Sequence, residues 1–453
     1  MSFPEYGSRR NVGYGLLVAL FFLGFFHRFA PAAMADAMAA DLGVGAALLG
    51  VIVSMNFWVY TLMQLPAGLL IDRYGVGRVV GTGAVLTACG AGVLSLARDS
   101  GLAMLGPALV GLGTASVFSG IMKYNMRWFP ARRYALVTGV TMLLGTLGSL
   151  MAEAPVAALL LFVDWRVLLE AVAVATLILA AAVFALVREA PDRAKLPHRP
   201  DGRTSPGTSA RPAVVPGGKR LPGAAAPAGA SSNRWTMRER LTATLRNKQL
   251  WKLLICTAGT NGTFYAFAGL WAIPYLMNRQ EMDKGEAVAI VSASMAAYGA
   301  GALLMGHLSD RIAARKPLII GSALIAAAAW TGLAWHPDMP QAVVTGLCVL
   351  LGLSASQVTV SFTSIKESVD VDADATAIAL SNTGVFLIAA LVQTLYGVIL
   401  DAGGAADAAA ASTLSAGAYG AAMWLPVAVA CAGVAAAIGM RETYPRQYCA
   451  ECG

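Results

Sequence analysis

Twelve apolar stretches, each close to the length that a membrane-spanning helix requires, account for most of this 453-residue chain. A helix crosses the hydrocarbon core of a bilayer with about 20 mostly apolar residues. An unpaired strand would leave its backbone groups without partners in lipid, so the stretches are expected to be helices. The predicted spans are residues 12–33, 46–70, 79–97, 102–124, 134–154, 165–187, 249–274, 287–306, 317–335, 341–364, 376–400 and 418–440. The sequence therefore predicts an all-α membrane protein with twelve transmembrane helices.

The composition agrees with a protein that is mostly surrounded by lipid. Hydrophobic residues make up 57% of the chain and charged residues only 13%, whereas soluble domains carry about 25% charged residues. The net charge of +8 lies mainly in the segments between the apolar stretches, where Lys and Arg orient helices rather than bind a polyanion. We therefore expect the lipid bilayer, and no nucleic acid, as a partner.

One short charged segment occurs twice, after the second apolar stretch and after the eighth. Residues 68–78 and 306–316 share the pattern Gly-x-x-x-Asp-Arg, and the matched positions are offset by 238 residues, about half the chain. A fixed offset of this kind indicates an internal duplication. Parallel repeats are typical of one class of membrane transporter. The helices are therefore expected to form two pseudo-symmetric six-helix bundles.

The distribution of positive charge predicts how the helices are oriented. If both termini are inside the cell, only five of the 33 Lys and Arg residues fall outside the cytoplasmic loops and helix ends. Positive charge is strongly biased toward cytoplasmic loops in membrane proteins. The bias predicts a multi-pass protein of the bacterial inner membrane with both termini in the cytoplasm.

Residues 191–247 interrupt the alternation of apolar stretches and short loops. Pro, Gly, Ala, Ser and Arg dominate this segment, which has too little apolar content to fold alone. We interpret it as a disordered cytoplasmic linker in which Arg234–Arg246 have the pattern of a short basic amphipathic helix. The expected domains are an N-terminal six-helix bundle over residues 1–190, this linker, and a C-terminal bundle with a short cytoplasmic tail over residues 248–453.

These patterns together resemble the major facilitator superfamily. The repeated segment is similar to the loop between helices 2 and 3 of that family and to its copy between helices 8 and 9. Residues 128–133, 376–384 and 393–401 resemble the anion:cation symporters and the organophosphate antiporters, and residues 164–166 open the sixth helix as in many members. The resemblance implies a secondary active transporter that moves a small organic anion by alternating access, with proton-coupled uptake as the favoured mode. It implies a monomer without a cofactor and without enzymatic activity.

In the family that this chain resembles, the repeated loops act as a latch that holds the cytoplasmic side shut. Gly68 allows two helices to approach closely. The Asp72 carboxylate can accept hydrogen bonds from the free N–H groups of the helix that starts near Thr376, and Asp310 from the helix that starts near Tyr134. The expected gating residues are Gly68, Asp72, Arg73, Arg78, Asp310 and Arg311. The alternative is that these loops only set topology.

Departures from the family patterns narrow the expected function. Drug:proton antiporters carry an arginine in helix 4 and a Gly-Pro pair in helix 5, whereas this chain has Pro107 and the sequence Glu-Ala-Pro at residues 153–155. Organophosphate antiporters use one arginine in helix 1 and one in helix 7, and this chain has only the first, Arg28. Multidrug export and transport of a dianionic phosphate ester are therefore disfavoured.

Polar residues inside the spans are candidates for the transport site, because placing them in a membrane is costly. Arg28 is expected to bind the substrate anion, and Glu153 or His27 to carry the coupling proton. The expected substrate-binding residues are Arg28, His27, Asn261, Tyr265, Gln357 and Asn382. The alternatives are that His27 is an ordinary buried histidine and that Glu153 is an interface residue paired with a nearby cation.

Soft metal ligands support a second hypothesis. Two pairs of methionines are spaced one helical turn apart, Met34/Met38 and Met122/Met126. The tail contains a C-x-x-C sequence formed by Cys449 and Cys452. Thioether and thiolate ligands suit Cu(I), yet methionine also fills protein cores without further function. Transport of copper or of a metal chelate such as a siderophore, and a solute sensor that moves nothing, are the alternatives to anion transport.

Overall fold

The computed structural model describes residues 3–129, 131–187, 237–335, 339–369, 374–403 and 416–444. In the first half of the chain the helices are α1 (Phe3–Leu42), α2 (Ala46–Tyr74), α3 (Val76–Ser95), α4 (Ser100–Trp128), α5 (Ala131–Met151), α6 (Ala154–Leu159) and α7 (Trp165–Leu186). In the second half they are α8 (Met237–Arg246), α9 (Lys248–Thr257), α10 (Thr263–Ala266), α11 (Ala272–Arg279), α12 (Lys284–Ile312), α13 (Lys316–Trp335), α14 (Gln341–Ala355), α15 (Val358–Ser368), α16 (Asp374–Gly403) and α17 (Ala416–Ile438). The described residues contain no strand.

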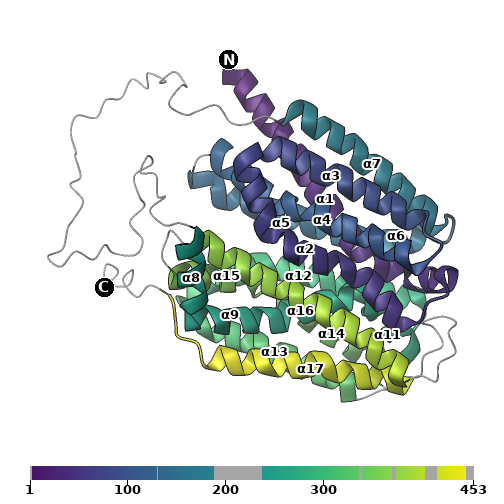
Figure 1. Ribbon diagram of the computed structural model, residues 1–453. Coiled ribbons are helices and arrows are strands. Elements are labelled where there is room, and N and C mark those ends of the chain that lie inside the picture. Colours follow the sequence, from purple (N-terminus) through teal and green to yellow (C-terminus); the bar gives the residue numbers. More distant parts are fainter. Residues whose placement is uncertain are drawn as a thin grey trace, which may run out of the picture.

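The predicted class, an all-α membrane protein with the twelve-helix architecture, is confirmed. Eleven helical segments among the described residues are long and apolar enough to cross a bilayer. The twelfth predicted span, residues 249–274, falls in a continuous helical run from Lys248 to Arg279 that two π-helical turns divide into shorter pieces. Figure 1 shows α1–α7 packed together on one side of the molecule and α9–α17 on the other.

The seventh span is irregular along much of its described length. Its two π-helical turns are η2 (Ala258–Gly262) and η3 (Phe267–Trp271), and every residue in both turns is buried. Gly262 allows this helix to approach α16 closely, because a Cβ atom there would lie 2.8 Å from the Val385 carbonyl oxygen. π-Helical turns are frequent at functional sites. Because both turns are fully buried, the irregular part of the helix lies in the interior, where a transport site is expected.

The two bundles are joined at the end where α2 begins and α16 ends, which we call the far side. Both carboxylate oxygens of Asp401, in α16, accept backbone hydrogen bonds at the start of α2, from Ala46 at 3.0 Å and Ala47 at 2.9 Å. Gly397 makes this crossing possible, because a Cβ atom there would lie 2.5 Å from the Ala46 carbonyl oxygen. About two helical turns deeper, Ser54 bonds to Thr394 of α16. The bundles are therefore fastened together at the far side.

We expect Asp401→Asn to loosen this closure, because the amide offers one acceptor oxygen and no charge to the positive end of α2. Loss of a helix cap costs about 0.5–2 kcal/mol, so labelling of a cysteine introduced at Ser54 by an impermeant maleimide should accelerate roughly threefold or more. The background would lack the exposed native cysteines, Cys89 and Cys431. Asp99→Asn is the matched control, because Asp99 caps α4 by accepting from the Leu102 N–H within its own bundle. Equal labelling rates in the two variants would contradict a gating role for Asp401.

Candidate functional site

Arg28 lies midway along α1, where the two bundles face each other, and is only 5% exposed. Aromatic rings from both bundles surround its guanidinium carbon. The ring centroids of Tyr60 and Phe386 are each 4.6 Å from that carbon, with Phe25 at 5.2 Å and Phe57 at 5.9 Å. Three of these rings come from the first bundle, and Phe386 comes from α16 in the second. We call Phe25, Phe57, Tyr60 and Phe386 the aromatic cage.

The Arg28 charge has no acidic partner among the described residues. Its Nε atom is buried and makes no hydrogen bond to any of them. Cation–π contacts with several rings offset part of the cost of burying the guanidinium. Such contacts do not replace a carboxylate, because a buried charge is stable only when it is paired and hydrogen-bonded. The site therefore carries a positive charge that an anion would neutralise.

Two tyrosines of the second bundle stand beside this cage. The hydroxyls of Tyr265, in α10, and Tyr298, in α12, are 2.9 Å apart. The Tyr265 ring stacks on Phe386 with centroids 5.7 Å apart and meets Phe29 of α1 edge-on at 5.5 Å. The predicted residues Arg28 and Tyr265 are thus brought together at one place.

Two other predicted residues, Asn261 and Gln357, belong to a hydrogen-bond network inside the second bundle. Asn261 Nδ2 donates to the Ala355 carbonyl at 3.2 Å. Gln357 Nε2 donates to Thr260 Oγ1 at 2.9 Å, and its Oε1 accepts from Ser361 at 2.6 Å. This network holds the irregular seventh span against the break between α14 and α15. Their expected role in binding substrate stays a prediction.

The remaining predicted binding residues are His27, in α1, and Asn382, in α16. His27 Nε2 is 3.4 Å from the Thr176 hydroxyl of α7, so its ring points into the first bundle. Asn382 is half-buried in α16. It precedes Phe386 by four residues, which places both on one face of that helix. Asn382 is therefore one helical turn from the aromatic cage.

Glu153, the predicted proton carrier, occupies the break between α5 and α6. The residue is fully buried, and neither carboxylate oxygen has a hydrogen-bond partner among the described residues. Ser292 of α12, in the other bundle, lies beside it, although the two side chains are not in hydrogen-bond geometry. A carboxylate in this position is well placed to be neutral in one conformation and charged in another. The carrier role of Glu153 stays a prediction.

The free volume next to Arg28 is small. A cavity of about 30 Å³ lies on the first-bundle side of Arg28, and its lining includes His27, Met34, Met38 and Asn56. This volume holds about one water molecule, which is too little for an organic anion. Within the described part of the chain, no three His, Cys, Asp or Glu side chains are grouped as metal ligands. Cys449 and Cys452 lie outside the described residues.

The predicted gating residues lie at the end opposite the far side. Asp72 forms an ion pair of 2.7 Å with Lys123 of α4, in its own bundle. Arg73 packs over Tyr74, and Arg78 and Arg311 are exposed. A side chain added at Gly68 would meet open space. The Asp310 side chain lies outside the described part of the structure. The latch between bundles therefore stays a prediction, and the conformation described here is closed on the far side instead.

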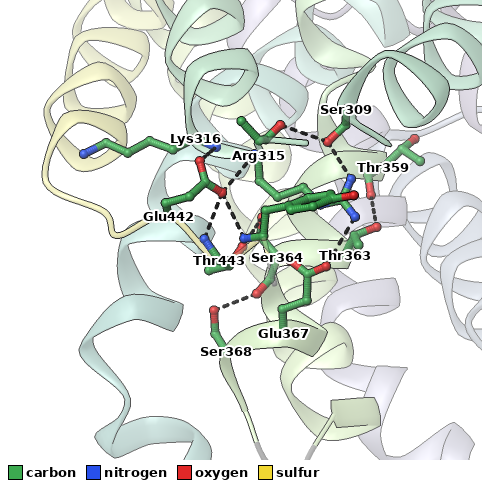
Figure 2. A network of polar contacts seen from close by, with 12 residues as sticks. Ser309, Arg315, Lys316, Thr359, Thr363, Ser364, Glu367, Ser368, Glu442 and Thr443 are labelled. Carbon is green, nitrogen blue, oxygen red and sulfur yellow. Dashed lines mark hydrogen bonds and ion pairs between the residues drawn. The ribbon is translucent and has the colours of Figure 1, made fainter. Parts of the chain in front are cut away.

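A buried arginine near the end of the second copy of the repeated segment organises the same end of the second bundle (Figure 2). Arg315 Nη1 donates to Ser309 Oγ at 2.6 Å, and Arg315 Nη2 lies 3.3 Å from Glu367. Glu442, just after α17, caps the start of α13 by accepting from the backbone N–H groups of Arg315 and Lys316 at 2.9 and 3.0 Å. Partial burial alone would raise the pKa of Glu442, but four backbone hydrogen bonds to the carboxylate lower it overall.

Because the pKa of Glu442 is lower in the folded protein, its stabilising effect is complete above its ordinary value of 4.5 and disappears as the pH falls through the folded value. At pH 7 we expect Glu442→Ala to accelerate hydrogen exchange at the first amides of α13, with a loss of about 0.5–1 kcal/mol, the lower part of the range for helix caps. The exchange rate of the Glu442→Gln variant should lie between those of wild type and Glu442→Ala. The difference from wild type should shrink below pH 4.5. Unchanged exchange at Arg315 and Lys316 would contradict the cap.

Sequence reasoning missed two parts of this arrangement. Phe57, Tyr60 and Phe386 lie in apolar stretches and look like ordinary lipid-facing or core residues. Their gathering around Arg28 depends on the packing of α1 and α2 against α16, which lies far away in the chain. The role of Asp401 could have been predicted, because an acidic residue at the end of an apolar span is a candidate cap for a neighbouring helix.

Comparisons with known proteins agree with this architecture. The sequence model described as Major Facilitator Superfamily matches residues 16–392 and, in a second alignment, residues 253–447. Among solved structures, a bacterial homologue of the human lysosomal transporter Spinster, in an inward-facing and unoccupied conformation, superposes with a TM-score of 0.73 at 16% identity over 97% of this chain and 98% of that one. The nucleoside transporter NupG superposes with a TM-score of 0.67 at 13% identity, over 93% of this chain and 99% of that one. These likenesses show the fold alone.

Similarity to curated proteins is more limited in length. An uncharacterized transporter, YybO of Bacillus subtilis (strain 168), is 32% identical over 152 residues, which are 34% of this chain and 35% of that protein. A putative tartrate transporter of Agrobacterium vitis is 24% identical over 355 residues, 75% of this chain and 73% of that protein. A quinolone resistance transporter of Acinetobacter baumannii is 27% identical over 190 residues, 40% and 43% of the two chains. The chain thus spans about a third of the first relative's length and about three quarters of the second's.

Proposed function

This chain belongs to the Major Facilitator Superfamily, and on that premise we propose that it carries a small organic anion across the bacterial inner membrane by alternating access, in symport with protons. The observation that carries the proposal is the buried guanidinium of Arg28, which lies between the two bundles without an acidic partner. An anion that binds there removes an unpaired charge from the interior. A relative named as a putative tartrate transporter supports an organic anion as cargo.

The position of Arg28 also suits alternating access. Transporters of this architecture bind substrate near the bilayer midplane, where the two repeats meet, and rock one bundle against the other around that site. The cage around Arg28 takes rings from both bundles, so rocking them apart would open it. The far side is fastened by Asp401, so the proposed conformation is closed to the outside if both termini are cytoplasmic.

Proton coupling is proposed to run through Glu153 rather than His27. Glu153 lies at the contact between bundles beside Ser292, whereas His27 is directed toward Thr176 within one bundle. A group that reports on the rocking motion has to sit where the bundles meet. The domains are proposed as residues 1–190 and 248–453, tethered by the linker, in a monomer that has no enzymatic activity.

The proposal is tested by reconstituting the full chain into liposomes. A mixture of radiolabelled organic anions inside should exchange saturably with unlabelled anions outside, and an imposed inward proton gradient should drive accumulation. Saturable binding without flux would instead support a solute sensor. Flux that does not respond to the proton gradient would contradict proton symport and would support facilitated transport of the anion.

A further inference from the structure

We propose that the anion bound at Arg28 is a monocarboxylate with a flat aromatic body, and not a hydroxylated dicarboxylate. This inference rests on the proposed function, since it specifies which class of organic anion the same site accepts. Four observations support it: a single charge, a wall of rings, a satisfied pair of hydroxyls, and two side-chain amides with unsatisfied atoms, Asn56 beside Arg28 and Gln393 in α16.

The charge at the site matches one carboxylate. Two small cavities flank Arg28, and the titratable side chains that line them are Arg28 itself, His27 and Tyr60. His27 is directed toward Thr176 of α7. The guanidinium presents a rigid fork that matches one carboxylate in two parallel hydrogen bonds. A second carboxylate on the same ligand would be buried against aromatic rings without a cation, which is strongly unfavourable.

The wall around the guanidinium is aromatic and apolar. The Tyr60 and Phe386 rings, from different bundles, meet edge-to-face with their centroids 4.6 Å apart. Phe57 stacks on Phe386 with centroids 5.9 Å apart. Aromatic rings prefer offset-stacked and edge-to-face neighbours at such distances. A flat aromatic ligand can therefore take up stacking contacts between the two bundles as its carboxylate draws the guanidinium out of the cage.

The few unsatisfied polar groups near the cage, Asn56 Oδ1 and the Gln393 amide, favour a ligand with few polar substituents. The hydroxyls of Tyr265 and Tyr298 already bond to each other. Gln393 of α16 is fully buried, and neither atom of its side-chain amide has a partner among the described residues. Its Nε2 atom and the Phe57 ring both lie within 4 Å of where a Cβ of Gly269 would stand. The free amide thus faces the same region as the cage and can bind a ring hydroxyl.

The test uses purified full-length protein in nanodiscs at neutral pH, with four ionised probes: benzoate, 4-hydroxybenzoate, cyclohexanecarboxylate and tartrate. We expect benzoate to bind at least about fivefold more tightly than cyclohexanecarboxylate, the scale of one or two aromatic contacts. Tartrate should bind most weakly, and 4-hydroxybenzoate should bind more tightly than benzoate. Gln393→Leu should remove the difference between the last two.

Variants of the cage separate recognition from folding. Phe386→Leu should abolish the preference for benzoate over cyclohexanecarboxylate, whereas Phe386→Tyr should retain it. Phe267→Leu is the matched control, because Phe267 is a buried ring that packs on Trp330 and Tyr275 away from Arg28. If Phe386→Leu weakens both ligands equally, the cage has only a structural role and the inference is overturned.

Two further outcomes distinguish this inference from the function on which it rests. Tartrate or cyclohexanecarboxylate binding as tightly as benzoate, in a manner that depends on Arg28, would overturn the aromatic class and leave anion transport standing. Failure of all four carboxylates to bind the folded protein, together with no anion exchange in liposomes, would overturn both.

Discussion

Replacing Arg28 by methionine is expected to abolish saturable anion transport and at the same time to make the empty protein more stable. Methionine has a similar length and fits among rings, but it brings no charge into the interior. Exchanging a buried charge for an apolar side chain of similar volume is often neutral or stabilising by about 1–4 kcal/mol. Arg28→Lys keeps the charge but loses the planar fork, so we expect anion binding to weaken by about 1–3 kcal/mol.

The measurements are anion affinity and thermal unfolding of the same preparations. Arg166→Met is the matched control, because Arg166 is already satisfied by Asp41 and by the carbonyls of Ser95 and Ala97 in one bundle. That variant should lose stability and keep anion affinity. If Arg28→Met is less stable than wild type and binds the anion normally, Arg28 holds the helices together and is not the anion site.

Replacing Glu153 by glutamine is expected to uncouple transport from protons. Glutamine mimics the protonated carboxylic acid in shape and remains neutral throughout the cycle. Proton-driven accumulation should therefore fall to the level seen without a gradient, a loss of at least about tenfold at a typical gradient of one pH unit. Exchange of internal for external anion should continue, because exchange does not require the carrier to return empty.

The control for this experiment is His27→Gln, whose side chain can still bond to Thr176 within the first bundle. Accumulation and exchange are measured in the same liposomes with and without the proton gradient. Uncoupling by the His27 variant, with normal coupling in the Glu153 variant, would transfer the proton role to His27. Loss of exchange in the Glu153 variant would indicate a role in opening the site and not in coupling.

Much of the architecture follows from the sequence because the bilayer imposes strong rules. Span length, the repeated Gly-x-x-x-Asp-Arg segment and the isolated Arg28 are all visible in one dimension. The predicted helix over Arg234–Arg246 agrees with α8, which starts at Met237. Most of the linker, residues 191–236, lies outside the described residues.

The parts that the sequence leaves open are those that depend on contact between distant helices. Nothing in the residues around Phe386 indicates that this ring covers an arginine more than 350 positions earlier. The π-helical turns of the seventh span are also hidden, because their residues are as apolar and small as those of the neighbouring α-helical turns. The conformation could not be predicted from the sequence either. The repeated loops predict a latch at one end of the molecule, whereas the structure shows Asp401 joining the bundles at the other end.

Each of the two π-helical turns in the seventh span contains one residue more than an α-helical turn would. Converting such a turn to α geometry therefore turns the helix beyond it by about 100°. Tyr265 stands between η2 and η3, and a change in either turn would rotate its hydroxyl relative to Tyr298 without breaking the helix. The span can therefore change the direction of Tyr265, together with the helical segment that follows the altered turn, while it stays helical throughout.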